Sequence, residues 1–77
     1  MKVIYSKHWK RKQEKKRKDI MKDMIEFVLL NSSEMRDKHW ANLFNKIARV
    51  PPSGRTLKVV YKKQEGKIFI VTSFWLD

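Results

Sequence analysis

The chain contains no cysteine, and its 77 residues include only two glycines and two prolines. The absence of cysteine excludes disulfide bonds and thiolate zinc sites, and two histidines without a cysteine partner do not predict a structural metal. We expect no cofactor and no metal. A chain of this length forms one domain, residues 1–77, near the size at which a single hydrophobic core suffices.

Long apolar runs are also missing. No run reaches 18 apolar residues, and no signal-peptide core precedes the basic block near the N-terminus. We therefore expect a soluble, cytoplasmic protein that makes no use of a membrane. The hydrophobic fraction of 42% argues against overall disorder.

Acidic residues are few. Nineteen Lys and Arg against eight Asp and Glu give a net charge of +11, and residues 7–18 alone carry eight basic residues and one acidic residue. A basic cluster of this density is typical of proteins that bind nucleic acid, because the release of counterions supplies affinity. An acidic protein partner, an anionic membrane surface and a merely solvated face are the alternatives.

The N-terminal half predicts a strand followed by helix. Branched and aromatic residues at 2–5 favour a short strand, and Ser6 can cap the helix that follows. No Gly or Pro occurs between residues 7 and 31, so helix is favoured throughout, with one break where Asp19 could cap a second helix. We expect Trp9 to anchor the first, basic helix. The second helix has an apolar stripe at three- and four-residue spacing, formed by Ile20, Met21, Met24, Ile25, Val28 and Leu29.

The C-terminal half predicts strands. Residues 56–62 alternate in polarity, residues 68–76 are apolar on both faces, and residues 63–66 form a four-residue turn between them. The second of these strands is therefore expected to be central and covered on both sides. The segment 41–50 can be helix or strand, and strand is preferred because two strands alone need a partner. The predicted fold class is α+β: a short N-terminal strand, one or two helices packed on one face, and an antiparallel three- to four-stranded sheet.

Several short motifs follow one another along residues 1–75: Ser6 and His8, then Val28, Leu29 and Asn31, then Val59, Val60 and Tyr61, and finally Thr72. Their order and spacing resemble those of a small, poorly characterised branch of the RelE/ParE-like toxin superfamily. The resemblance implies a RelE-like fold and a toxin of a toxin–antitoxin pair. Many members of that superfamily are metal-independent ribonucleases that cut messenger RNA, often on the ribosome, and others poison gyrase.

Metal-free RNA cleavage requires a base, a cation that holds the developing charge, and an acid. His8, in the first turn of the basic helix, is the candidate for acid–base work because its pKa is ordinarily near neutral. Arg55 could clamp a phosphate, and Tyr61 could donate a proton or stack on a base, although core packing is the alternative for Tyr61. The Thr72 hydroxyl either reaches the site or bonds a neighbouring strand. The cations expected to bind RNA are Lys10, Arg11, Lys12, Lys15, Lys16, Arg17 and Lys58.

We therefore expect the toxin component of a toxin–antitoxin system, a metal-independent endoribonuclease that cuts mRNA and inhibits translation. Its partners would be a cognate antitoxin protein and RNA, with or without the ribosome. The alternative is a non-catalytic basic module of the same fold that binds RNA or the ribosome.

Overall fold

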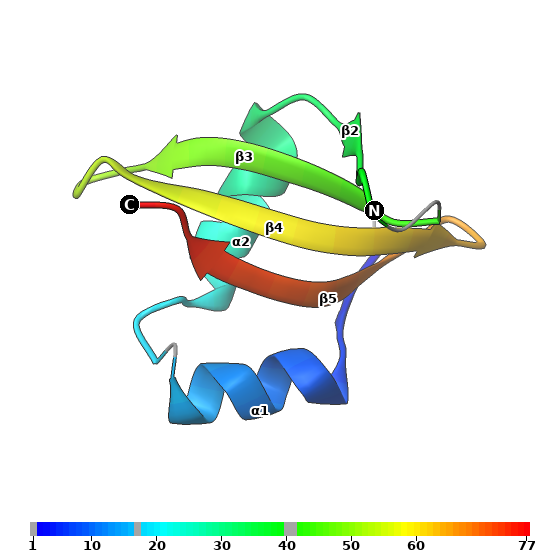
Figure 1. The fold of residues 1–77 in the computed structure, drawn as a ribbon, viewed down its shortest axis with the longest axis horizontal. Helices are drawn as coiled ribbons and strands as arrows, with labels where there is room; N and C mark the ends of the chain where they lie inside the picture. The colour runs from blue at the N-terminus through cyan, green and yellow to red at the C-terminus, as the bar shows by residue number, and fades with distance from the viewer. Residues whose placement is uncertain (1, 17, 40–41) are drawn as a thin grey trace.

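The computed structural model describes residues 2–16, 18–39 and 42–77, which form two helices and a five-stranded mixed sheet (Figure 1). The strand order is β1-β5-β4-β3-β2, with β1 parallel to β5 and all other neighbours antiparallel. The α+β class is confirmed. The sheet has five strands, whereas three or four were predicted. The N-terminal strand joins one edge of the sheet, and a two-residue strand joins the other edge. The elements are β1 (Lys2–Tyr5), α1 (Lys7–Lys15), α2 (Lys22–Asn31), β2 (Met35–Arg36), β3 (Phe44–Val50), β4 (Arg55–Gln64) and β5 (Lys67–Trp75).

Helix α1 is fixed by its cap and by one aromatic residue, as the sequence predicts. The Trp9 backbone N–H donates to Ser6 Oγ at 3.0 Å, which satisfies one free donor of the first turn. Trp9 is the buried residue of this helix, with 3% of its surface exposed. Its indole N–H donates to Ser73 Oγ on β5 at 2.6 Å, and its ring centroid lies 4.6 Å from that of Tyr5. One side chain therefore attaches the basic helix to the sheet.

The break between the helices differs from the prediction. Helix α2 begins at Lys22, and the residue in its cap position is Met21, which makes no side-chain capping bond. The prediction that Asp19 caps this helix is wrong, because its carboxylate is bound to side chains at the end of the sheet. At the other end of α2, Lys46 Nζ donates to the Leu29 carbonyl oxygen at 2.6 Å, where a cation is favoured by the helix dipole.

The hydrophobic core lies between the two helices and one face of the sheet. Helix α1 contacts β5 and helix α2 contacts β3 and β4, and Figure 1 shows α2 behind the sheet. The predicted apolar stripe of α2 is buried, apart from exposed Met21 and half-buried Met24. Strand β5 is internal, as predicted, but the described helices cover only one of its faces. The buried core residues are Trp9, Ile20, Ile25, Val28, Leu29, Val50, Leu57, Val59, Tyr61, Ile68 and Ile70.

Two turns set the lengths of the long strands. The 41–50 segment forms a strand from Phe44 to Val50, as preferred, and residues 51–54 form the turn before β4. The predicted four-residue turn after β4 is too long, because β4 continues to Gln64 and the turn consists of Glu65 and Gly66. Both turn residues have positive φ, 52° and 75°, which a two-residue hairpin turn of this twist requires and glycine adopts readily.

Candidate nucleic-acid interface

Positive charge has little internal compensation in this molecule. None of the five strands contains an Asp or a Glu, and α1 contains five Lys or Arg and one Glu. In the part of the chain that the structure describes, the ion pairs are Arg55 with Asp19 at 3.0 Å and Lys63 with Glu34 at 2.9 Å. Most of the described Lys and Arg side chains are therefore available to a polyanion.

One face of α1 forms a basic hollow, which we call the α1 hollow. Its volume is about 340 Å³. Residues three and four apart on a helix lie on the same face, so the cations stand above one another in successive turns beside His8, which is exposed. The single acid of this helix, Glu14, lines a separate hollow together with Lys10. The α1 hollow is lined by His8, Arg11, Lys12, Lys15 and Lys16.

The sheet face opposite the helices, which we call the open face, combines lysines with aromatic rings. In the strand register Lys58 stands opposite Phe74, and Lys62 stands opposite Phe69. Lys58 Nζ lies 5.8 Å from the Phe74 ring centroid and Lys62 Nζ lies 5.6 Å from the Phe69 ring centroid, both within cation–π range. By register, the open face includes Ile4, Asn45, Ile47, Arg49, Lys58, Val60, Lys62, Phe69, Thr72 and Phe74.

A second hollow, which we call the β2–β3 hollow, lies at the side of the open face and has a volume of about 360 Å³. Asn45 is 6% exposed, and its Oδ1 atom is buried with no hydrogen-bond partner among the residues that the structure describes. A buried polar atom without a partner is rare in folded proteins and costs stability. The hollow is lined by Met35, Arg36, Asp37, Lys38, His39, Asn45, Ile47 and Lys58.

The structure places the four predicted catalytic residues on separate parts of the molecule. His8 lies in the α1 hollow, whereas Thr72 lies on the open face, paired with Val60. Tyr61 is fully buried in the core, and its hydroxyl donates to Glu34 Oε1 at 2.6 Å. Burial, followed by the bond to Glu34, raises the pKa of Tyr61 well above its usual value. Core packing is therefore the role that the geometry gives to Tyr61.

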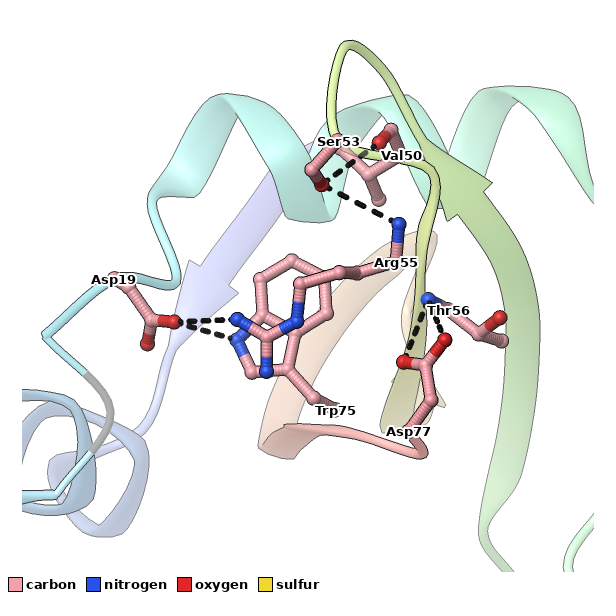
Figure 2. A network of polar contacts seen from close by, with 7 residues as sticks. All are labelled: Asp19, Val50, Ser53, Arg55, Thr56, Trp75 and Asp77. Carbon is pink, nitrogen blue, oxygen red and sulfur yellow. Dashed lines mark hydrogen bonds and ion pairs between the residues drawn. The ribbon is translucent and has the colours of Figure 1, made fainter.

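Arg55 opens β4 and takes part in a network at the end of the sheet (Figure 2). Its guanidinium lies 4.2 Å from the Trp75 ring centroid, and its Nη1 donates to Asp19 Oδ2 at 3.0 Å. The Trp75 indole N–H donates to the same carboxylate oxygen at 2.9 Å. This network fastens the connection between the two helices to the sheet. The sequence carries no signal for it, because Asp19 and Arg55 are 36 residues apart.

The predicted RNA-binding cations divide between two surfaces. Lys58 lies on the open face, and Lys10 lies on α1 beside the α1 hollow. Arg17 falls outside the described residues. The sequence predicted the cations of α1 from their density, but it carries no signal for Asn45, whose importance depends on burial. The remaining predicted cations all line the α1 hollow: Arg11, Lys12, Lys15 and Lys16.

Comparison with protein-family models, with curated proteins and with solved structures finds no match for this chain. The resemblance to RelE/ParE-like toxins therefore stays a prediction from the sequence motifs. None of the helices in the described ranges is long and apolar enough to cross a membrane.

Proposed function

We propose that the protein binds RNA through the α1 hollow and the adjoining basic surface. The observation that carries this proposal is the uncompensated positive charge: acid-free strands, and five basic side chains against one acidic side chain on α1. Neutralisation of phosphates by these cations would release counterions, and the resulting gain in affinity would fall steeply as the salt concentration rises. The cap at Ser6 and the buried Trp9 support the proposal because they hold the cations in fixed positions.

The test is the salt dependence of binding to a labelled single-stranded RNA, measured by fluorescence anisotropy. Each of Arg11→Gln, Lys12→Gln and Lys15→Gln should weaken binding and lower the slope of log K against log salt by about 0.7 for each phosphate that is no longer neutralised. Lys67→Gln is the matched control, because it removes the same charge from the start of β5, outside both hollows that α1 lines. Slopes that fall equally for the control and the α1 variants would show that α1 is not the contact surface.

Metal-independent RNA cleavage is a second candidate, favoured by the position of His8. Its imidazole lines the same hollow as four cations, so a phosphate bound there would lie beside a group able to accept or donate a proton near neutral pH. We expect wild-type protein to cleave RNA in the presence of EDTA. His8→Ala should abolish cleavage while RNA binding is retained, because His8 is exposed and its loss should change stability by less than about 0.5 kcal/mol. Cleavage by a folded His8→Ala protein would exclude this role.

The resemblance to RelE/ParE-like toxins extends the proposal to a toxin that cuts mRNA in the cytoplasm, with or without the ribosome, and is masked by a cognate antitoxin. An acidic antitoxin surface would be complementary to the α1 hollow. Expression of the wild-type chain should then arrest growth, and His8→Ala should relieve the arrest at equal protein level. Equal growth arrest by the wild-type chain and by His8→Ala would show that toxicity does not depend on His8.

A further inference from the structure

The β2–β3 hollow combines features that a nucleotide requires. Its volume of about 360 Å³ is within the range of small-molecule sites. Met35 and Ile47 supply apolar surface, and Lys38 and Lys58 supply positive charge. Such a mixture of apolar surface with a few polar groups favours a flat, partly charged ligand over an ion alone.

Asn45 supplies the specific group in this hollow. Its Oδ1 atom is a buried acceptor with no donor among the described residues, although Arg36, Lys38 and Lys58 also line the hollow. Two of these cations lie near aromatic rings instead: Lys58 Nζ lies 5.8 Å from the Phe74 centroid, and the Arg36 guanidinium lies 5.8 Å from the centroid of Phe44, which is on the covered face of the sheet. Within the described ranges this acceptor is therefore left without a donor, and a ligand can supply one.

We propose that the β2–β3 hollow binds an adenine nucleotide, with Asn45 Oδ1 accepting a hydrogen bond from the exocyclic amino group of the base. Asn is the side chain whose amide geometry matches the amino edge of adenine. His39 offers an imidazole on which the base can stack, and Lys38 and Lys58 offer charge for its phosphate. The backbone N–H of His39 donates to Asp37 Oδ2 at 2.9 Å, and this bond holds the segment that carries His39.

Access to Asn45 requires a side chain to move. Its Oδ1 is covered in this structure, and its register partners on the same face are Met35 on β2, which is 47% exposed, and Val60 on β4. Methionine is flexible, and β2 is a strand of only two residues, so displacement of Met35 disturbs little of the sheet. The amino group of adenine can then take the place of the missing donor.

The same chemistry can come from an unpaired adenosine in RNA or from a free mononucleotide. The first source rests on the RNA binding proposed above, and the second does not. Hexamers of adenosine and of purine riboside have the same charge and differ only in the 6-amino group, so they isolate the contact with Asn45. AMP and purine riboside monophosphate provide the same comparison with single nucleotides instead of an RNA strand.

The experiment measures the affinity of wild type, Asn45→Leu and Lys58→Gln for all four probes, by anisotropy for the hexamers and by NMR titration for the mononucleotides. Wild type should prefer the amino-bearing probe by about three- to tenfold, the effect of one hydrogen bond. Asn45→Leu should abolish this preference, whereas Lys58→Gln should weaken both members of a pair equally and keep it. Circular dichroism confirms the fold of each variant.

The outcomes separate the two proposals. Equal affinity of wild type for both hexamers and for both mononucleotides would overturn the adenine pocket and leave RNA binding in place. A preference confined to the mononucleotides, with no binding of either hexamer, would support the pocket and contradict RNA binding. A preference that survives in Asn45→Leu would overturn the role of Asn45.

Discussion

The contact between Trp9 and Ser73 should contribute more to stability than an ordinary polar contact, because both partners are almost completely buried. They are 3% and 1% exposed, and the indole N–H donates to the hydroxyl oxygen at 2.6 Å. Ser73→Ala removes the acceptor and leaves the indole N–H in the core without a partner. A buried donor in that condition costs about 1–3 kcal/mol, a large part of the roughly 4–12 kcal/mol expected for a domain of this size.

The assay is equilibrium unfolding in urea followed by circular dichroism, with a double-mutant cycle to isolate the hydrogen bond. Ser73→Ala should lower the free energy of unfolding by about 1–3 kcal/mol in the wild-type background. In a Trp9→Phe background no indole N–H remains, so Ser73→Ala should cost at least about 1 kcal/mol less. An equal cost in both backgrounds would refute the reasoning, because the effect of Ser73→Ala would then arise from its other contacts.

The same contact links stability to the proposed binding surface. A nine-residue helix is too short to be stable alone in water, and Trp9 is the buried residue of α1. Weakening its attachment should therefore release α1 before the sheet unfolds. Hydrogen exchange of Ser73→Ala should show faster exchange in α1 than in β4, whose amides lie inside the sheet.

Two further perturbations concern acidic residues. Hydrogen bonds from Tyr61 and Lys63 lower the pKa of Glu34 below its usual 4.5, so its contribution to stability is present above that value and is lost as the pH falls through the lowered pKa. Glu34→Gln should therefore be less stable than wild type at pH 7 and equal to it in strong acid, and a constant difference in urea unfolding across pH would contradict this. Asp19→Asn should cost less than about 1 kcal/mol, because the ion pair with Arg55 is exposed, and the cost should shrink in about 0.5 M salt. A larger, salt-independent loss in thermal melts would show that the network in Figure 2 acts through packing instead.

Local features of the fold could be predicted because they depend on neighbouring residues. The Ser6 cap, the anchoring of Trp9 and the apolar stripe of α2 follow from spacing within a few positions. The placement of β1 could not be predicted in this way. It pairs with β5, more than sixty residues later, and no local pattern in Lys2–Tyr5 specifies which edge of a sheet it joins.

The candidate site was predictable where it depends on composition and not where it depends on register. The density of cations in residues 7–18 identified α1, and the structure brings four of them together with His8. The sequence offers Tyr61 and Thr72 as candidates for one site, with core packing or a bond to a neighbouring strand as their other roles, but Tyr61 pairs with Phe44 on the covered face, whereas Thr72 pairs with Val60 on the open face. A register shift between Val60 and Tyr61 alters which residues stand opposite each other, and such a bulge leaves no clear mark in the sequence.

The few acidic residues are mostly committed to the fold, and this explains why the positive charge stays available. Carboxylates accept hydrogen bonds at the helix connection, at the first turn of α2, beside Tyr61, in the turn after β2 and at the start of β4. Each of these acceptors fixes local structure, and two of them, Asp19 and Glu34, also pair with Arg55 and Lys63. A net charge of +11 destabilises a compact chain through self-repulsion, and a bound polyanion relieves that repulsion in the native state alone. Binding and folding are therefore linked, and RNA at concentrations above its dissociation constant should stabilise the fold as well as occupy its surface.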